Sequence, residues 1–248
     1  MADIQSLRKR LIEKAKTQIV EKYSGRDAHI IRAVNVLEDL DSIFNLLTEQ
    51  LKEWHGMNFP ELDNLMDDNE KYVQLVAKLG ERKNFEEKKV EETVKNNEVA
   101  KKIDYAAKNS IGSEIGKNDL DEISKLANNA LAIRKERAEL ESYVNKEMSA
   151  LCPHSAKLAG SVIGAKMIAK AGSLKRLAMM PSSTIQIIGA EKALFAHLRE
   201  GAKSPKYGIL YQHPTVKAAK KEEKGKVARK LAGKLAIAIR QDYFGKNK

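Results

Sequence analysis

The chain has 248 residues, of which 42% are hydrophobic and 32% charged, so it is long enough for one or two domains with apolar cores. An aromatic content of 5%, with five prolines and fourteen glycines, disfavours a turn-rich all-β fold and favours long helices. The single cysteine, Cys152, excludes an intrachain disulfide and a thiolate metal cluster, and no apolar run approaches the length of a membrane span.

The net charge of +11 is distributed unevenly along the chain. Residues 150–248 hold 20 Lys and Arg against 5 Asp and Glu, whereas residues 1–149 hold 25 against 29. The excess of basic charge therefore belongs to the C-terminal part, which indicates a polyanionic partner there. Charge carried for solubility, as on the lysine-rich surfaces of thermophile proteins, is the alternative, but it does not explain the segregation.

Residues 1–149 contain few helix-breaking residues and predict a series of helices. The first, over 4–21, is an amphipathic start rather than a signal peptide. The second, over 26–55, carries two apolar seams, which predicts packing against more than one neighbour. One seam contains Val36, Leu40, Ile43, Leu47, Leu51 and Trp54, and the other contains Ile30, Val34, Leu37 and Phe44.

The stretch from 60 to 149 predicts a long antiparallel helical hairpin. Pro60 suits the first residue of a helix, residues 81–104 are charged as in a solvent-exposed tip, and residues 111–119 indicate a turn. From Leu126 to Val144 the apolar residues follow a 3.5-residue repeat that Arg137 interrupts. The expected fold class is all-α, with an elongated antiparallel helical coiled-coil domain over 1–149 and a compact helical domain over 150–248.

The C-terminal part shifts in composition toward Ala, Gly, Ile and Lys after Cys152. Helices are expected over 153–171, 173–180, 181–199 and 217–240, with a loop at 201–215. We expect helix 181–199 to begin at a capping box of Ser183 and Gln186. Its core face is predicted to hold Ile185, Ile188, Phe195 and Leu198.

A second stripe on helix 181–199 combines small and basic residues, namely Gly189, Lys192, Ala196 and Arg199. Because glycine costs about 1 kcal/mol in a helix interior relative to alanine, Gly189 needs a packing or functional reason. A nucleic-acid backbone or a second protein lying on this stripe is one reason. Close approach of a neighbouring helix of the same domain is the other.

The last helix and the loop before it carry further candidate contacts. A regular basic stripe on the helix suits phosphate groups, although a solvated charged face is the alternative. The opposite face predicts a buried row of Val227, Leu231, Leu235 and Ala238. In the loop, Tyr207 and Gln212 lie among cations, where aromatic and amide side chains can stack on or bond to RNA bases, and Tyr211 is expected in the core.

Catalysis is poorly supported by the sequence. The five histidines lack metal-ligand spacing, and no phosphate-binding loop motif is present. Cys152 and His154 are too close in sequence to imply a catalytic pair, and a buried thiol at a domain start is the simpler interpretation. We expect no enzyme activity, no metal and no cofactor.

The heptapeptide GAEKALF at 189–195 resembles the signature of the Nop domain family, scaffold proteins of box C/D small ribonucleoprotein particles. Residues 171–198, 204–214 and 225–242 follow the family in order and spacing, and residues 51–62 are similar to its Trp-x-Gly-x-x-Phe-Pro-Glu-Leu segment. The resemblance implies a non-catalytic scaffold that directs RNA ribose 2′-O-methylation. Residues 150–248 would be the Nop domain, and the coiled coil would join two copies of the chain.

The resemblance also implies partners. A Nop domain recognises the joint surface of a kink-turn RNA and its kink-turn-binding protein. The family holds the methyltransferase fibrillarin through a separate N-terminal domain, which we expect to be absent from this chain. The location would be cytoplasmic in an archaeon, or nucleolar in a eukaryote, and no membrane is involved.

Site residues follow from the match to the motif. Near the composite surface we expect Ile187, Gly189, Ala190 and Glu191. For RNA contact the candidates are Lys192, Gln212, His213, Lys226, Arg229, Lys234 and Arg240. Family members often have His at the position of Gln212, so here we expect a hydrogen bond instead of stacking.

Two other functions stay open at this point. One is the spliceosomal relative that binds a kink-turn in a small nuclear RNA. The other is a coiled-coil protein whose basic end binds DNA or acidic partners nonspecifically.

Overall fold

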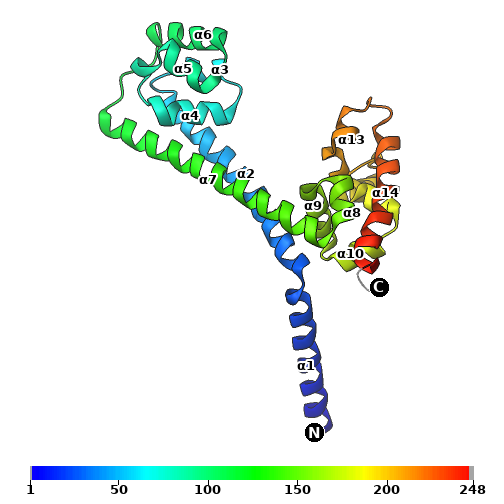
Figure 1. The fold of residues 1–248 in the computed structure, drawn as a ribbon. Helices are drawn as coiled ribbons and strands as arrows, with labels where there is room; N and C mark the ends of the chain where they lie inside the picture. The colour runs from blue at the N-terminus through cyan, green and yellow to red at the C-terminus, as the bar shows by residue number, and fades with distance from the viewer. Residues whose placement is uncertain (1, 246–248) are drawn as a thin grey trace. The chain divides into compact units, whose positions relative to one another are not determined.

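The computed structural model describes residues 2–245, with side chains from residue 4 onward except at 18 and 20–24 (Figure 1). Within this range the chain forms helices and no strand, so the predicted all-α fold is confirmed. The α-helices are α1 (Ala2–Ser24), α2 (Arg26–His55), α3 (Glu61–Leu65), α4 (Asn69–Leu79), α5 (Glu87–Val94), α6 (Asn97–Lys108), α7 (Lys117–Leu151), α8 (Pro153–Ala159), α9 (Ser161–Ala171), α10 (Leu174–Met179), α11 (Ser182–Ile187), α12 (Glu191–Glu200), α13 (Pro214–Ala218) and α14 (Lys224–Phe244). Two short 3₁₀ helices, η1 (Arg82–Asn84) and η2 (Ile209–Gln212), complete the elements.

The chain divides into two compact units. One consists of residues 37–139, and the other combines residues 1–36 with residues 140–248. The long helices α2 and α7 each contribute to both units. The predicted functional boundary between 149 and 150 stays a prediction.

The unit of residues 37–139 is built on antiparallel segments of α2 and α7. Near the end of α2, the Ser113 amide donates to the Met57 carbonyl at 2.8 Å, and α7 begins four residues later. Toward the other end, Arg137 donates from Nε to Asp41 at 2.8 Å. The long hairpin predicted over 60–149 is therefore wrong in its extent, because α7 pairs along α2 as well. Of residues 60–109, α4 lies against α7, with Glu70 accepting from Arg134 at 2.9 Å and the Ala77 carbonyl accepting from Ser124 at 3.5 Å.

Residues 60–109 form a group of short helices instead of one long arm (Figure 1). Asp68 caps α4 by accepting from the Glu70 and Lys71 amides, and Asn96 caps α6 in the same way. Each cap starts a new helix and so breaks a continuous arm. The core between these helices and the long pair includes Leu51, Phe59, Tyr72, Phe85, Ile103 and Ile123.

Charged side chains also join α2, α4 and α7. Arg134 donates to Glu70 at 2.9 Å and to Asp41 at 3.1 Å, and its guanidinium lies 5.0 Å from the centre of the Phe44 ring. Arg137 shares the same Asp41 carboxylate. The arginine that interrupts the apolar repeat is thus part of a network of two cations and two carboxylates.

The two apolar seams of α2 have different environments. Leu37 and Phe44 of the second seam are buried, and so is Leu51 of the first. Ile43 and Trp54 of the first seam, together with Leu46 from outside both seams, remain accessible within the described chain, and we call these three the exposed seam. The prediction that α2 packs against more than one neighbour is therefore met on one side only, and an apolar row is left uncovered.

Acid is expected to destabilise residues 37–139 through His55. This buried ring donates from Nε2 to the Gly80 carbonyl at 2.9 Å and accepts at Nδ1 from the Tyr72 hydroxyl at 3.3 Å. Burial lowers the pKa of His55 below its ordinary value of 6.5, although the bond to Gly80 opposes this. As the pH falls below 6.5, the unfolded chain takes up the proton first, so stability decreases by up to about 1.4 kcal/mol per pH unit.

Urea unfolding followed by the fluorescence of Trp54, the single tryptophan, measures this effect. A His55→Gln variant should be less stable at neutral pH and should lose much of the pH slope. A His197→Gln variant, which replaces a half-buried ring on α12 in the other unit, serves as the control and should leave the slope unchanged. An equal slope in the wild type and in His55→Gln would refute the assignment.

The second unit places α8 to α14 around a separate core. Residues of α9, α10, α11 and α14 are buried together with η2, among them Met167, Leu177, Ile185, Leu210 and Leu235. Helices α8, α10 and α11 each contact α14, which is the central element of this unit. Within the described residues, no helix is both long enough and apolar enough to span a membrane.

Candidate nucleic-acid and protein interface

The signature segment folds as two helices joined by a sharp turn, and the prediction of one helix over 181–199 is wrong. Helix α11 ends at Ile187 and α12 begins at Glu191. The predicted capping box does not form, because no side chain caps α11 and Gln186 instead donates to the Lys206 carbonyl at 2.7 Å. The residues between the helices therefore form a turn whose bonds lead to a distant segment.

A backbone pairing with residues 208–209 fixes this turn. The Gly208 amide donates to the Gln186 carbonyl at 3.1 Å, and the Ile209 amide donates to the Ile188 carbonyl at 2.8 Å. These carbonyls are thus used by another segment and not by a continuing helix. Gly189 takes a φ of +86°, a conformation that glycine adopts without a Cβ penalty. The turn therefore explains why residue 189 is glycine. The expected reason, a partner or neighbouring helix lying on a continuous helix face, does not apply.

The four residues predicted at the protein-binding surface are adjacent at this turn. Gly189 and Glu191 are exposed, and Ile187 and Ala190 are half-buried. The Glu191 carboxylate accepts from the Gly189 amide at 2.8 Å, which ties the start of α12 to the turn. The four residues therefore lie together at one partly exposed turn, and their role in binding a partner stays a prediction.

Helix α12 contains no buried residue. Phe195 and Leu198, predicted in the core, are 62% and 70% exposed. The prediction failed because the spacing of apolar residues identifies an apolar face on α12. The spacing does not show whether another part of the same chain covers that face. Lys192 and Arg199 are exposed on the same helix, so α12 presents apolar and cationic side chains together.

The loop before α14 holds an aromatic stack. The rings of Tyr207 and Tyr211 are 5.2 Å apart and inclined by 18°, and the Lys224 ammonium lies 4.7 Å from the centre of the Tyr211 ring. Tyr211 is exposed, so its predicted burial is wrong. Ile209 and Leu210 fill the core position instead, because η2 turns Tyr211 outward.

Two candidate RNA-contact residues of this loop have partners in the chain. His213 accepts at Nδ1 from the Thr215 amide at 3.3 Å, as the cap of α13, and its Nε2 donates to the Leu158 carbonyl at 3.2 Å. Gln212 is exposed and accepts from Lys166 at 3.4 Å. His213 therefore shapes the loop, while the amide of Gln212 remains accessible.

Helix α14 displays the predicted basic stripe. It begins at Lys224 and not at 217, since α13 and a turn precede it. Lys226, Arg229, Lys230 and Lys234 are all exposed. Leu231, Leu235 and Ala238 are buried, as predicted, and Val227 is half-buried.

Arg240 differs from the other candidates on α14. Its guanidinium donates to the carbonyls of Ala178 and Met180, both at 3.2 Å. These bonds hold the end of α10 against α14. Arg240 is thus engaged with the backbone of its own unit, although its side chain reaches the surface.

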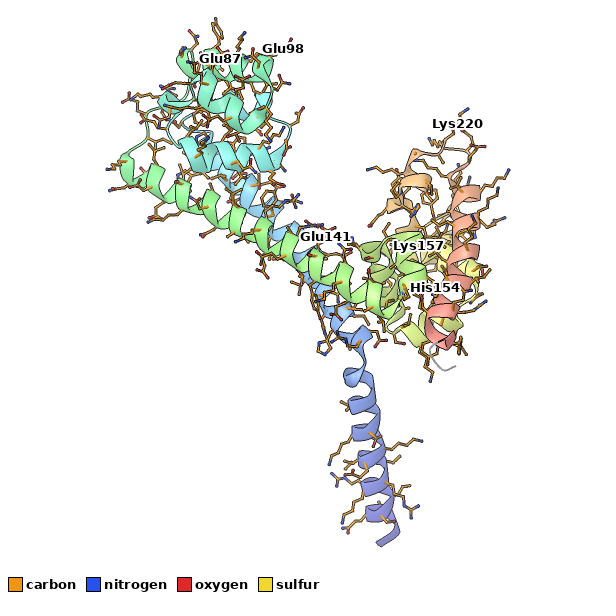
Figure 2. All side chains as sticks on the ribbon, in the orientation of Figure 1. Glu87, Glu98, Glu141, His154, Lys157 and Lys220 are labelled. Atoms are coloured by element: carbon orange, nitrogen blue, oxygen red, sulfur yellow. The ribbon has the colours of Figure 1, made fainter. Side chains whose placement is uncertain are left out.

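Sequence reasoning missed a cluster at the start of α8. The buried carboxylate of Asp242 accepts from the His154 amide, from His154 Nδ1, from the Ser155 amide and from Ser155 Oγ. Figure 2 shows His154 beside the C-terminal part of α14. The only sequence signal was that Asp242 is one of five acidic residues after 149.

The composition of this cluster suggests a catalytic triad, but its geometry is that of a helix cap. Ser155 is buried and donates to Asp242, not to the histidine. The carboxylate satisfies the first amides of α8, which otherwise lack partners. Among the described residues no group of three His, Cys, Asp or Glu side chains is arranged to hold a metal.

Comparisons with known proteins agree with the signature. The family model described as "Nop: snoRNA binding domain, fibrillarin" matches residues 36–248. An uncharacterised NOP5 family protein of Methanocaldococcus jannaschii is 46% identical over 229 residues, covering 92% of this chain and 55% of the relative. Nucleolar protein 58 of Emericella nidulans is 40% identical over 216 residues, covering 87% of this chain and 37% of that protein. A solved chain from a fibrillarin/Nop5p complex has a TM-score of 0.48 and 24% identity, covering 97% of this chain and 70% of that chain.

The chain thus spans about half the length of its archaeal relative and a smaller share of the fungal one. The family model covers α12, the turn before it and the described part of α14. The resemblance inferred from residues 189–195 is confirmed: the chain belongs to the Nop family.

Proposed function

We propose that the chain is a non-catalytic scaffold of a box C/D ribonucleoprotein, which directs RNA ribose 2′-O-methylation. Residues 150–248 bind the composite surface of a kink-turn RNA and its kink-turn-binding protein. Residues 1–149 self-associate. Fibrillarin is the methyltransferase of such particles, and we assign its recruitment to no residue of this chain. The location is cytoplasmic in an archaeon or nucleolar in a eukaryote.

The observation that carries the RNA and protein-binding proposal is the surface of α12. Phe195 and Leu198 offer apolar area that a protein surface would cover, and Lys192 and Arg199 offer cations for phosphates. A surface of both kinds suits a partner that is half protein and half nucleic acid. The exposed basic stripe of α14 supports a phosphate backbone on the same unit.

Binding of the full chain to a kink-turn RNA, with and without the kink-turn-binding protein and at two salt concentrations, tests the proposal. Tight binding is expected only to the preformed complex. A Phe195→Ser/Leu198→Ser variant should weaken it about tenfold or more, because partner burial of both side chains is lost. Lys192→Ala should reduce the salt slope by about one.

Matched controls separate this surface from general charge and hydrophobicity. Met179→Ser removes an equally exposed apolar side chain of α10, and Lys157→Ala removes an exposed lysine of α8 (Figure 2). Both should bind like the wild type. Equal and steeply salt-dependent binding to random duplex RNA would instead support the nonspecific basic domain. A preference for a spliceosomal kink-turn would support the spliceosomal relative.

Self-association is supported by the exposed seam of Ile43, Leu46 and Trp54. An Ile43→Asp/Leu46→Asp variant is expected to raise the dissociation constant of the dimer at least about tenfold, since charges would be buried in an apolar contact. Light scattering during gel filtration over a concentration series gives the mass. Ile237→Asp, at an exposed position on α14, is the control and should remain dimeric. A wild-type chain that stays monomeric throughout would contradict self-association.

A further inference from the structure

A groove with an apolar lining lies between α3 and α6, in the unit of residues 37–139. Its volume is about 510 Å³, and Figure 1 shows both helices at the same end of that unit. The side chains of Leu65 and Ala106 are half-buried there and pack against the core of the unit. The lining residues are Glu61, Asn64, Leu65, Lys101, Lys102, Tyr105 and Ala106.

Two of the most exposed large apolar side chains of this unit lie at the groove. Tyr105 lines it and is 71% exposed. Ile111 is 90% exposed, and its amide donates to the Glu61 carboxylate at 3.0 Å, so it is held beside the lining. Single exposed apolar residues are ordinary, but two of them beside an apolar hollow mark a site that a partner covers.

The carboxylates around the groove already have partners. Glu61 accepts from Ser110 Oγ at 2.6 Å as well as from the Ile111 amide. Burial is the largest single effect and raises the pKa of Glu61, but these bonds and the charge of Arg82 together outweigh it and lower the pKa overall. Asp63 pairs with Lys52, and Asp104 pairs with Lys108, at 2.6 Å each.

The two lysines of the groove, by contrast, have no ion-pair partner among the described residues. Lys101 and Lys102 are both exposed on α6. Glu98, one turn earlier on the same helix, lies near the end of the unit and forms an ion pair with neither lysine among the described residues (Figure 2). The groove therefore offers an apolar floor, an aromatic ring and two exposed lysines without an ion-pair partner among the described residues.

We propose that this groove docks a short acidic segment of a partner protein. An apolar side chain of the segment packs against Leu65 and Ala106 beside the Tyr105 ring, and flanking carboxylates pair with Lys101 and Lys102. This surface lies in the other unit from the α12 and α14 surface, so it is a second, separate interaction site.

The charge of the unit favours a peptide over RNA as the occupant. Residues 37–139 hold 16 Lys and Arg against 23 Asp and Glu, a net charge of −7. This net charge opposes any polyanion, but a nucleic-acid backbone depends on many distributed cations and would extend over more of the negative surface than a short segment does. A short segment needs only the two local lysines and gains the apolar contact as well.

Methyl and amide NMR of the full chain, titrated with a synthetic Glu-rich peptide that carries a central Trp-Leu pair, tests the proposal. Shifts are expected at Leu65, Ala106 and Ile111. The dissociation constant measured from these signals should rise about tenfold in Tyr105→Ala, and also in the double variant Lys101→Glu/Lys102→Glu. Lys88→Glu, a charge reversal at an exposed site on α5, should not change it.

Three probes make the outcome decisive. A peptide with alanine in place of the Trp-Leu pair should bind more weakly at these signals, and a Lys-rich version should not bind there. Shifts confined to residues 150–248 would show that the peptide meets only the basic surface, and would overturn the proposal. Shifts at Leu65 and Ala106 with single-stranded polyuridine, but not with the acidic peptide, would overturn it in favour of RNA.

Discussion

Replacing Asp242 with alanine is expected to lower the free energy of unfolding of the unit that combines residues 1–36 and 140–248 by about 3 kcal/mol. The reason is that buried donors lose their acceptor. The Ser155 amide and hydroxyl are both buried and both donate to the same carboxylate oxygen. An unsatisfied buried donor costs about 1 to 3 kcal/mol, and the Ser155 amide has no other acceptor among the hydrogen bonds of the described residues. The Ser155 hydroxyl can turn to the Cys152 carbonyl, 3.3 Å away, and the exposed ring of His154 can turn to water, so the amide accounts for most of the loss.

Hydrogen exchange of the α8 and α14 amides measures this loss where it occurs, since two units need not unfold as one. Glu222→Ala, at an exposed acidic residue just before α14, is the control and should change exchange little. The urea transition reported by Trp54, in the other unit, should also remain unchanged. If exchange in α8 is unaffected by the Asp242 variant, the carboxylate is not the cap that its bonds indicate.

Asp242→Asn tests the geometry of the same cap. The amide retains one oxygen for either the His154 or the Ser155 donors but presents an N–H₂ group to the other set. An intermediate loss is therefore expected. Asparagine has nearly the same volume as aspartate, so the loss in Asp242→Asn measures the lost hydrogen bonds. The further loss in Asp242→Ala includes the missing side-chain volume.

The helical content of this chain follows from its sequence, but the lengths of the helices do not. Asp68 and Asn96 occupy ordinary N-cap positions and were available as start signals within 60–109. The periodic apolar marks on both sides of them suggested continuity instead. The pairing of α7 with α2 depends on contacts such as Arg137 with Asp41, which are 96 residues apart and have no local signature.

The candidate site was predictable where it depends on local pattern. The basic stripe of α14 and its buried face both follow from helical spacing, and the structure places them as expected. The break at Gly189 was not predictable in this way, because the pairing with residues 208–209 removes the carbonyls that a continuous helix would use. From the sequence, Arg240 is likewise predicted to be a basic surface residue. Its bonds to the Ala178 and Met180 carbonyls arise only in the folded structure.

Replacing Gly208 with alanine is expected to disrupt the turn that orients α12. A Cβ at this position would lie 2.0 Å from the Ile188 carbonyl oxygen and 2.7 Å from that of Ile187. Both are backbone atoms that cannot move aside alone. The pairing of Gly208 with Gln186 and of Ile209 with Ile188 must therefore open, at an expected cost of about 3 kcal/mol.

This variant also tests whether the turn matters for binding. Gly233→Ala, in the interior of α14 with open space around the position, is the matched control. It should be neutral or stabilising by up to about 1 kcal/mol, since alanine favours a helix. Gly208→Ala, at a temperature where circular dichroism shows α14 folded, should lose binding to the kink-turn complex while retaining nonspecific RNA binding by the α14 stripe. Unchanged binding to the complex would mean that Lys192, Phe195 and Leu198 bind it whatever the conformation of the α11–α12 turn. The proposed binding site would then be α12 alone, without the turn residues.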